Sequence, residues 1–285
     1  MSDTTPFLKF LTGSFSTPAG GNPTGIMVEA AYAQHDIPAR FINCDVAAAN
    51  LADAVRGAVA MGWIGFNCSL PHKQTVIKHL NELGKSASLI GAVNCVIRRG
   101  DRLMGENTDG QGFLTSLRTV ADPQGTRVTI LGAGGAARAI AVELALAGAS
   151  EITIVNRNRE RAEELAHTVN ASTSTTARPV EWTGTYEIPS ETDILVNATS
   201  VGLAPRADQR LDLDMDTLGS RLVVCDVIMN PPQTHLLRTA ASHGATVLDG
   251  RGMLVNQAAL NIWHWTDVRV DTAVLRSTLD RVLQN

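Results

Sequence analysis

The sequence predicts an α/β protein of two lobes, one built on a mixed sheet and the other on a doubly wound parallel sheet. Three observations favour this fold class. Short apolar runs alternate with segments of helical spacing along the 285 residues, a length sufficient for two cores. The runs of the second half are almost wholly apolar, which is typical of parallel strands covered on both faces. One of them leads into a glycine-rich turn that opens a predicted helix.

In the first lobe, strands are expected at the apolar runs, and helices where apolar residues recur with a helical period. Arg98 to Asp101 separates two runs compatible with strands, so a β-hairpin is predicted there. The stretch from Asp122 to Gly125 then breaks the pattern. The expected elements are strand 7–11, helix 26–33, strand 40–44, helix 51–60, strand 63–67, hairpin strands 93–97 and 102–104, and helix 109–120.

The second lobe shows a clearer alternation of strands and helices, which begins at Val128. Two polar segments, 172–176 and 204–216, are interpreted as surface connections without chemistry of their own. The expected elements are strand 128–131, helix 136–147, strand 152–155, helix 159–169, strands 194–196 and 222–227, and two closing helices at 253–265 and 270–283.

Composition excludes several functional classes. The 24 lysines and arginines nearly balance 28 acidic residues, and a net charge of −4 provides no field that would attract nucleic acid. No apolar run approaches the roughly 20 residues needed to cross a bilayer, and residues 1–6 lack the profile of a signal peptide. A soluble, cytoplasmic protein is therefore expected. Cys44, Cys68, Cys95 and Cys225 have neither metal-ligand nor disulfide spacing, so we expect free thiols and no metal site.

The turn from Gly132 to Arg138 has the context of a nucleotide-binding glycine turn, because it follows a strand and opens a helix. Gly132 permits the tight turn, Gly134 lets backbone amides approach a pyrophosphate, and the small Ala137 allows the helix to pack closely on the strand. The helix N-terminus then faces the phosphate charge. An ordinary glycine-rich turn before a helix is the alternative interpretation.

Residues about twenty positions after this turn indicate which dinucleotide binds. NAD-binding proteins usually place a carboxylate there for the ribose 2′-hydroxyl. This chain has Asn156, Arg157 and Asn158 instead, with Arg161 one helical turn further. Two guanidinium groups can hold a 2′-phosphate with charge-assisted hydrogen bonds, so NADP is favoured over NAD. A solvated run of arginines on a helix is the alternative.

Three upstream segments, 67–73, 91–94 and 106–110, gather polar groups where apolar runs end. With the glycine turn and two later segments, they resemble the motif order of the shikimate and quinate dehydrogenase family. Because six motifs agree in order and spacing over residues 60–265, the chain is identified as a member of that family. The matching segments are Asn67 to Lys73, with Ser69 in the place of a threonine, Ala92-Val93-Asn94, Asn107 to Gly110, Gly132 to Arg138, Asn197 to Ser200 and Gly250 to Gln257.

The resemblance implies that Lys73 and Asp109 form a catalytic pair at the reacting hydroxyl. Hydride transfer between an alcohol and nicotinamide needs an acid/base that removes or supplies the hydroxyl proton, and lysine does so near neutral pH only when its surroundings favour the neutral amine. Which of the two residues carries the proton stays open. The remaining substrate oxygens would be bound by Asn67, Ser69, Asn94 and Gln257.

The resemblance also implies the cofactor-binding residues. The glycine turn would hold the pyrophosphate, the asparagine and arginines after the second strand would hold the adenosine ribose, and two later motifs would shape the nicotinamide end. These residues are Gly132, Ala133, Gly134, Gly135, Ala136, Asn156, Arg157, Arg161, Asn197, Ala198, Thr199 and Met253.

The first sixty residues depart from the family, whose members bind the substrate carboxylate with a Ser-x-Ser-Pro segment and a following His-Asn pair. Here Ser14 and Ser16 precede a longer loop, Thr24 is a rival hydroxyl, and the following helix carries Val28-Glu29. Met229 stands where the family commonly presents a tyrosine. Since both changes affect the carboxylate site, the substrate is expected to differ from shikimate in that region. For the two serines, an ordinary role in a turn is the alternative.

The sequence therefore predicts an NADP-dependent oxidoreductase that interconverts a hydroxyl and a ketone on a shikimate-like cyclic hydroxy acid. The alternatives are the same chemistry on quinate, amino-shikimate or another cyclic polyol and, in a different class, a cofactor-binding regulatory relative with little turnover. Residues 1–112 with 254–285 are expected to form the substrate-binding domain, and 113–253 the Rossmann-like NADP-binding domain, with the active site between them. The expected partner is a small molecule, not nucleic acid or a membrane, and the chain is expected to be a monomer or homodimer.

Overall fold

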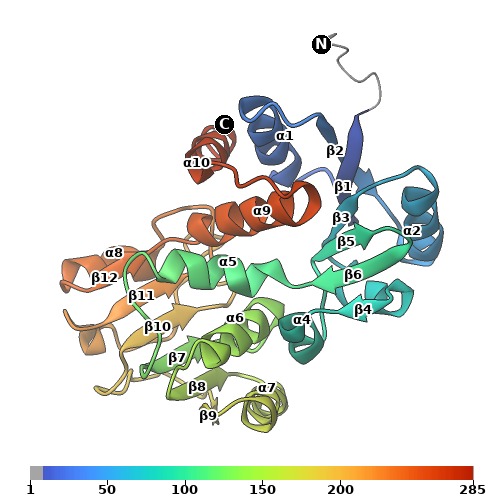
Figure 1. The fold of residues 1–285 in the computed structure, drawn as a ribbon. Coiled ribbons are helices and arrows are strands. Elements are labelled where there is room, and N and C mark those ends of the chain that lie inside the picture. The colour runs from blue at the N-terminus through green and yellow to red at the C-terminus, as the bar shows by residue number, and fades with distance from the viewer. Residues whose placement is uncertain (1–8, 285) are drawn as a thin grey trace. The chain divides into compact units, whose positions relative to one another are not determined.

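The computed structural model describes residues 9–284, along which helices and strands alternate (Figure 1). The chain divides into two compact units. Unit 1 comprises residues 1–108 and 257–285, and unit 2 comprises residues 109–256. Unit 1 is therefore assembled from two separate parts of the chain, whereas unit 2 is continuous. Phe7 and Leu8 of the first predicted strand lie outside the described residues.

Unit 1 contains a six-stranded sheet. Its strands are β1 Phe10–Ser16, β2 Ala39–Asp45, β3 Gly65–Cys68, β4 Glu82–Leu83, β5 Cys95–Arg99 and β6 Arg102–Glu106, and its helices are α1 Thr24–Gln34, α2 Leu51–Ala60, α3 His72–Thr75, α4 Lys85–Ile90, the larger part of α9 Arg251–Thr266 and α10 Thr272–Val282. The strand order is β2-β1-β3-β5-β6-β4. β1 pairs in parallel with β2 and β3, whereas β3, β5 and β6 are antiparallel neighbours, so the sheet is mixed, as predicted. The hairpin is confirmed, with Gly100 and Asp101 joining β5 to β6.

Unit 2 contains a second six-stranded sheet, in which all neighbouring strands are parallel. Its strands are β7 Arg127–Leu131, β8 Glu151–Asn156, β9 Thr176–Glu181, β10 Ile194–Asn197, β11 Val223–Asp226 and β12 Thr246–Leu248, and its helices are α5 Thr108–Leu117, α6 Gly135–Leu146, α7 Arg159–Ser172, α8 His235–Ser242 and the start of α9 Arg251–Thr266. The order β12-β11-β10-β7-β8-β9 places the first strand, β7, at the centre. This is the doubly wound Rossmann arrangement, and the fold-class prediction is confirmed.

The core of unit 2 covers both faces of this sheet. Ile130 and Ile154 pack into one buried cluster, while Leu131 and Val155, the next residue of each strand, pack into another. Alternation along a strand sends neighbouring side chains to opposite faces, so a strand covered on both sides needs apolar residues throughout. Burial of both faces of the sheet therefore explains the nearly unbroken apolar runs of the sequence.

Two strands and one α-helix of unit 2 are absent from the sequence prediction: β9, β12 and α8. β9 is an edge strand with the sequence Thr-Ala-Arg-Pro-Val-Glu, and most of its residues are exposed or half-buried. Edge strands tolerate proline and charge because one side of the strand needs no backbone partner. β12 is the opposite edge and only three residues long. Neither strand therefore has the apolar pattern that identifies a buried strand.

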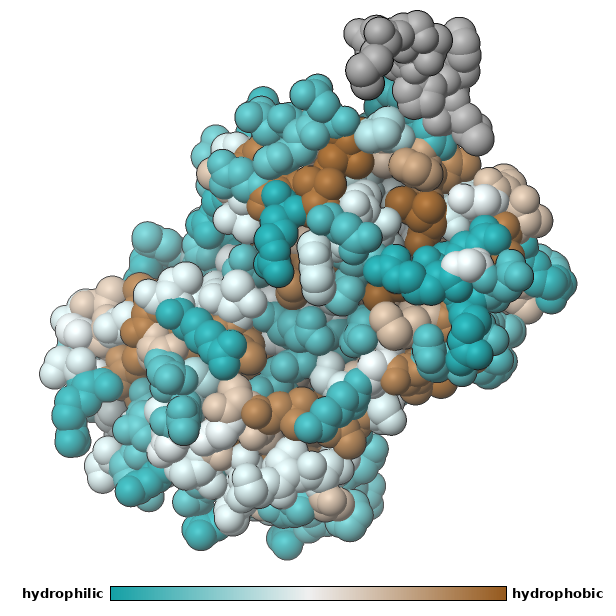
Figure 2. Space-filling view, in the orientation of Figure 1, coloured by the Kyte–Doolittle hydropathy of each residue, from teal (hydrophilic) through white to brown (hydrophobic). Residues whose placement is uncertain are grey.

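Within the described part of the chain, no helix has the length and apolar character needed to span a membrane. On the face drawn in Figure 2, hydrophobic residues form small groups between hydrophilic ones.

Candidate active site

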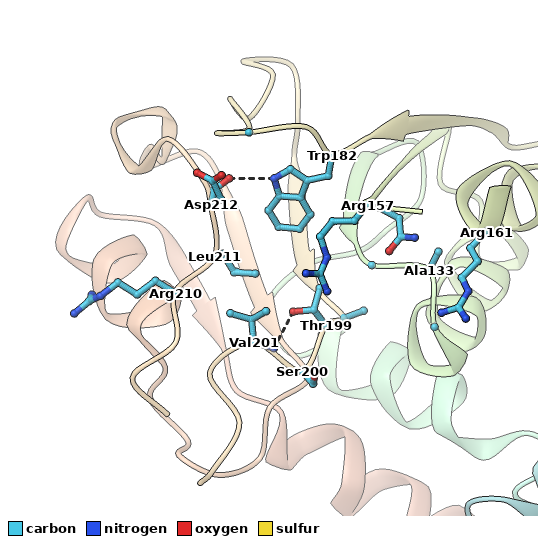
Figure 3. Close-up of a pocket in the computed structure, with 15 residues that line it drawn as sticks. Ala133, Arg157, Arg161, Trp182, Thr199, Ser200, Val201, Arg210, Leu211 and Asp212 are labelled. Atoms are coloured by element: carbon cyan, nitrogen blue, oxygen red, sulfur yellow. Dashed lines mark hydrogen bonds between the residues drawn. The ribbon is translucent and has the colours of Figure 1, made fainter. Parts of the chain in front are cut away.

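A cavity of about 470 Å³ lies in unit 2 where β7, β8, β9 and β10 end (Figure 3). In an open parallel sheet, ligands bind at the carboxyl ends of the strands, beside the point where the strand order reverses. Here that point lies between β7 and β10. The cavity is lined by Gly132, Ala133, Gly134, Asn156, Arg157, Arg161, Trp182, Gly184, Ala198, Thr199, Ser200, Val201, Arg210, Leu211 and Asp212.

The glycine turn has the backbone geometry that a phosphate site needs. Gly132 has a φ of 104°, which favours glycine, and a Cβ there would lie 3.1 Å from the carbonyl oxygen of Ala198. Gly134 caps α6, and a Cβ on it would meet nothing within 4 Å. The space beside Gly134 at the helix N-terminus is therefore open to an anionic group.

The arginines at the end of β8 differ in their contacts. Arg159 forms an ion pair with Glu163, at 2.7 Å along α7. Arg157 and Arg161 instead line the cavity, and within residues 9–284 neither forms a salt bridge. The Oδ1 atom of Asn158 accepts the backbone N–H of Arg161, which fixes the start of the helix. Two arginines without an ion pair thus line the cavity at the end of β8, an arrangement that fits the extra phosphate of NADP.

Asn197 lies below the cavity, fully buried, and holds the turn after β10. Its Oδ1 accepts hydrogen bonds from the backbone N–H and the hydroxyl of Thr199. Its amide nitrogen donates to Asp226 Oδ1 at 3.0 Å, and Thr234 donates to the other carboxylate oxygen at 2.7 Å. Burial raises the pKa of Asp226 to about 6, although these hydrogen bonds oppose the rise. Asn197 therefore positions Thr199 and does not itself line the cavity.

Eight of the predicted cofactor residues line the cavity, and four do not. Gly135 and Ala136 form the first turn of α6, Asn197 lies beneath the wall, and Met253 packs against the core of unit 2. Sequence reasoning missed Trp182 and the segment Arg210 to Asp212. The interpretation of 204–216 as a connection without chemistry is wrong at Arg210 to Asp212, which line the cavity. No local pattern identifies Trp182, because the strand before it, β9, lacks the apolar sequence of a buried strand.

In unit 1, the predicted substrate-binding amides meet around Asn94. The Asn94 side chain donates to Gln257 at 2.7 Å and to Thr108 at 3.0 Å, and its Oδ1 accepts the backbone N–H of Thr108 at 2.7 Å. The amide nitrogen of Asn67 donates to the backbone carbonyl of Asn94 at 2.8 Å. Chain continuity then places Asp109 one residue after the fixed Thr108.

Two predicted substrate contacts in unit 1 are buried polar atoms without a partner, Ser16 Oγ and Asn67 Oδ1. Ser16 is 4% exposed and Asn67 is 7% exposed, and they lie at the ends of the neighbouring strands β1 and β3. A buried polar atom left without a hydrogen bond costs free energy, about 1–3 kcal/mol, so Ser16 Oγ and Asn67 Oδ1 each have unused capacity for a hydrogen bond.

Ser14 and Thr24 differ from Ser16. Ser14 is fully buried and its hydroxyl donates to Asn43 Oδ1 at 2.9 Å, so its donor is already used within the protein. The backbone carbonyl of Asn22, in the longer loop, accepts from the Asn43 side chain at 3.2 Å. Thr24 is the first residue of α1 and is 5% exposed. Ser14 therefore anchors the inserted loop to β2.

Lys73 is half-buried in the short helix α3, and the backbone carbonyl of Lys73 accepts a hydrogen bond from Val93. Burial raises the pKa of the Cys68 thiol, and the nearby Lys73 charge opposes this rise. Ser69 is half-buried just before the helix, and its carbonyl accepts the N–H of His72. His72 is fully buried, with Nε2 2.7 Å from the carbonyl of Val46, and its other ring nitrogen has no partner.

Met229 is half-buried in unit 2, and its backbone carbonyl accepts a hydrogen bond from Arg251 Nε at 3.1 Å. The thioether has no proton to donate, so it cannot replace a tyrosine hydroxyl.

The sheet order, the open glycine turn and the two arginines of the cavity define a dinucleotide-dependent enzyme of the Rossmann class. Two family models match the chain: the shikimate dehydrogenase substrate binding domain over residues 18–96, and shikimate / quinate 5-dehydrogenase over residues 116–229. The chain belongs to the shikimate dehydrogenase family. It is an oxidoreductase that acts on a hydroxyl group with NADP, as predicted from the sequence.

Similar proteins cover nearly the whole chain. A shikimate dehydrogenase (NADP(+)) of Methanopyrus kandleri is 40% identical over 274 residues, 94% of each chain. The crystal structure of ligand-free 5-ketofructose reductase of Gluconobacter sp. strain CHM43 has 55% identity and a TM-score of 0.95, covering 97% of this chain and 100% of that one. A shikimate 5-dehydrogenase of Thermus thermophilus, solved with NADP(H) and shikimate, has 28% identity and a TM-score of 0.83, covering 96% and 100%.

Proposed function

We propose that this protein reduces one ketone of a small, uncharged polyhydroxy ketone of the 5-ketofructose type with NADPH. The observation that carries the proposal is the 55% identity to 5-ketofructose reductase over 97% of the chain. That similarity exceeds the 40% identity to the shikimate dehydrogenase of Methanopyrus kandleri. The reaction is the hydroxyl–ketone interconversion of the shikimate dehydrogenase family, and the proposal concerns the molecule on which it occurs.

The charges of unit 1 support an uncharged substrate. Asp45 ends β2 and is the strand partner of Ser16. Hydrogen bonds from Thr17 and from the N–H of Ala19 hold the pKa of Asp45 below its usual value, so this carboxylate is ionised at neutral pH. The family binds a substrate carboxylate at the segment that corresponds to Ser14 to Pro18. A negative charge beside that segment opposes an anion and is compatible with a sugar hydroxyl.

The unpaired atoms of the site also favour hydroxyl groups. Asn67 Oδ1 accepts hydrogen bonds only, so it needs a donor, which a sugar hydroxyl supplies and a carboxylate does not. Ser16 Oγ can both donate and accept. With Met229 in the usual tyrosine place, the chain has one donor fewer for a carboxylate.

Proton transfer in this mechanism belongs to Lys73 and Asp109. NADPH, held by the glycine turn and by Arg157 and Arg161, would supply the hydride for the carbonyl carbon. As negative charge develops on the carbonyl oxygen, the Lys73 ammonium donates a proton to it, and Asp109 orients the lysine or accepts a hydrogen bond from the product hydroxyl. Asn94 and Gln257 hold neighbouring oxygens, because their amides are hydrogen-bonded to each other and the Asn94 amide is also bonded to Thr108.

The second candidate substrate is the shikimate pair, 3-dehydroshikimate and shikimate, as first expected from the sequence. It is favoured by the names of the curated relatives, which are 32–40% identical to this chain.

The test of the substrate is steady-state oxidation of NADPH with 5-ketofructose and with 3-dehydroshikimate. We expect kcat/KM to be at least tenfold higher for 5-ketofructose. A higher value for 3-dehydroshikimate would overturn the proposed substrate and establish the second candidate. NADPH binding without turnover of either compound would favour the regulatory relative.

The Lys73→Met variant tests the proton donor. Loss of a general acid typically lowers the rate 10²- to 10⁴-fold, so we expect a fall in kcat of roughly that size. NADPH affinity, measured by titration calorimetry, should stay unchanged because Lys73 is not among the residues that line the cofactor cavity. Lys78→Met, on a lysine of the following segment, is the matched control. A Lys73→Met variant with normal kcat would contradict the assignment.

We also propose a reducing, cytoplasmic setting and a monomer or homodimer. The four cysteines are free thiols, and three of them are buried, which supports a compartment without disulfide formation. Light scattering should give the mass of one or two 30.3 kDa chains.

A further inference from the structure

Trp182 lies at the adenosine end of the cofactor cavity. It directly follows β9, and its backbone N–H donates to the carbonyl of Asn156 at 3.0 Å. Asn156 occupies the place at the end of the second strand where Rossmann proteins hold the adenosine ribose. β9 is the next strand outward from β8. The base attached to that ribose therefore falls beside Trp182.

The indole is held in one orientation before any ligand binds. Its Nε1 donates to the carbonyl oxygen of Asp212 at 3.1 Å, the same oxygen that accepts the N–H of Tyr186. Thr185 donates to the Asp212 carboxylate at 2.8 Å, and Asp214 N–H donates to Tyr186. These bonds join the segment after β9 to the segment before β11, so both move as one wall of the cavity.

One part of the Trp182 ring packs on the core while the rest lines the cavity. The side chain is half-buried against the leucine cluster of unit 2. Figure 3 shows the indole and the Arg157 side chain both directed into the cavity above Thr199 and Val201. Since its polar atom is already satisfied by Asp212, the ring offers an apolar aromatic surface to a ligand.

We propose that Trp182 is the stacking platform for the adenine ring of NADP, beside the 2′-phosphate position already assigned to Arg157 and Arg161. Aromatic side chains stack on the faces of nucleobases and make no hydrogen bonds to the base edges. Trp182 then contributes affinity for any adenine dinucleotide, while the arginines select the 2′-phosphate. The inference rests on the NADP cofactor of the proposed function and not on its substrate.

The test divides the cofactor into its two halves. Adenosine 2′,5′-bisphosphate and reduced nicotinamide mononucleotide are titrated calorimetrically into the whole protein and its variants. We expect Trp182→Ala to weaken bisphosphate binding by roughly five- to a hundredfold. Trp182→Phe, which keeps an aromatic face, should stay within about threefold of the wild type. Affinity for the mononucleotide should be the same in all variants.

Fluorescence supplies a readout that a merely structural role would not change. Bisphosphate binding should quench tryptophan emission in the wild type and in Trp263→Phe, a control in unit 1 where Trp263 faces Arg269 at 5.2 Å. The quench should be absent in Trp182→Phe. Unchanged bisphosphate affinity in Trp182→Ala would overturn the proposal, as would equal weakening of both halves with a lowered melting temperature. These experiments measure binding and not turnover, so they test the role of Trp182 even if the proposed substrate is wrong.

Discussion

At the scale of single residues, Asp226 is a buried carboxyl group whose ionisation changes the stability of the fold. It is 2% exposed, its carboxylate receives hydrogen bonds from Asn197, Ile228 and Thr234, and its pKa is raised to about 6. Because the ordinary value is about 3.9, ionisation of the folded protein is less favourable than ionisation of the unfolded chain. Asp226 therefore lowers the free energy of unfolding progressively as the pH rises from about 4 to about 6, and the full cost remains at higher pH.

The Asp226→Asn variant makes this cost measurable. The amide oxygen can keep the hydrogen bonds from Asn197 and Ile228, while the charge is removed. The free energy of unfolding of the variant minus that of the wild type should rise by up to about 3 kcal/mol from about pH 4 to about pH 7, and then level off. Urea denaturation at a series of pH values measures the difference. A difference that does not vary with pH would contradict a buried, ionising Asp226.

Arg157 and Arg159 form a matched pair for testing cofactor choice. Arg157 lines the cavity, whereas Arg159 is paired with Glu163. Loss of a hydrogen bond to a charged group costs about 1.5–3 kcal/mol, so Arg157→Ala should weaken NADPH binding roughly ten- to a hundredfold. NADH binding should change little, and Arg159→Ala should leave both unchanged. Calorimetric titration with NADPH and NADH measures both affinities. An unchanged preference for NADPH in Arg157→Ala would show that Arg157 does not bind the 2′-phosphate.

The cofactor residues were predictable because they form local sequence motifs, whereas the missed ones were not. The glycine turn and the arginines after β8 each lie within a few residues of one another. Trp182 and Asp212 are thirty positions apart and meet only through the hydrogen bond between them. The difference between Ser14 and Ser16 was equally hidden, because only the fold shows that Asn43 accepts the hydrogen bond of the Ser14 hydroxyl.

At the scale of secondary-structure elements, close packing in unit 1 depends on a glycine in β3. A Cβ on Gly65 would collide with the Trp265 indole of α9 and with the Val96 carbonyl. The indole N–H donates to that same carbonyl at 3.0 Å. β3 therefore needs glycine where the tryptophan lies on the sheet.

Gly65→Ala should displace Trp265 and lower the free energy of unfolding by about 1–3 kcal/mol. Chemical denaturation measures the change. Gly57→Ala in α2 is the control, because its new Cβ would meet only the Met61 methyl group, at 3.9 Å. That substitution should stabilise by about 0.5–1 kcal/mol through the helical backbone. If Gly65→Ala were as stable as the wild type, the packing argument would be wrong.

Element prediction succeeded where packing imposes a pattern and failed at the sheet edges. The four central strands of unit 2 are apolar because helices cover both faces, and all four are predicted within two residues of their observed ends. β9 and β12 each have one side without a strand partner. β9 therefore tolerates charged residues and a proline, and β12 is only three residues long. Pairing with β8 and β11 makes them strands.

At the scale of the whole molecule, the two units differ in continuity. Unit 2 is one segment, residues 109–256, while unit 1 needs residues 257–285 to supply α10. Leu275 and Leu279 of α10 are fully buried, and α10 packs against α1. A chain that lacks this segment would leave the apolar side of α1 uncovered.

We therefore expect a fragment of residues 109–256 to fold alone and bind adenosine 2′,5′-bisphosphate. A fragment of residues 1–108 should show no cooperative unfolding transition, whereas the same fragment fused to residues 257–285 should show one. Circular dichroism during denaturation distinguishes the cases. Cooperative unfolding of fragment 1–108 alone would show that α10 is dispensable.

Because unit 1 is formed from two separate parts of the chain, the ribosome completes unit 2 before it completes unit 1. Its first 108 residues leave the exit tunnel long before α10 exists, because the 148 residues of unit 2 are made in between, which takes roughly 7–30 s. During this interval unit 2 can fold, while unit 1 stays incomplete and accessible to chaperones. Premature termination after unit 2 would then release a protein able to take up NADP and unable to process any ketone.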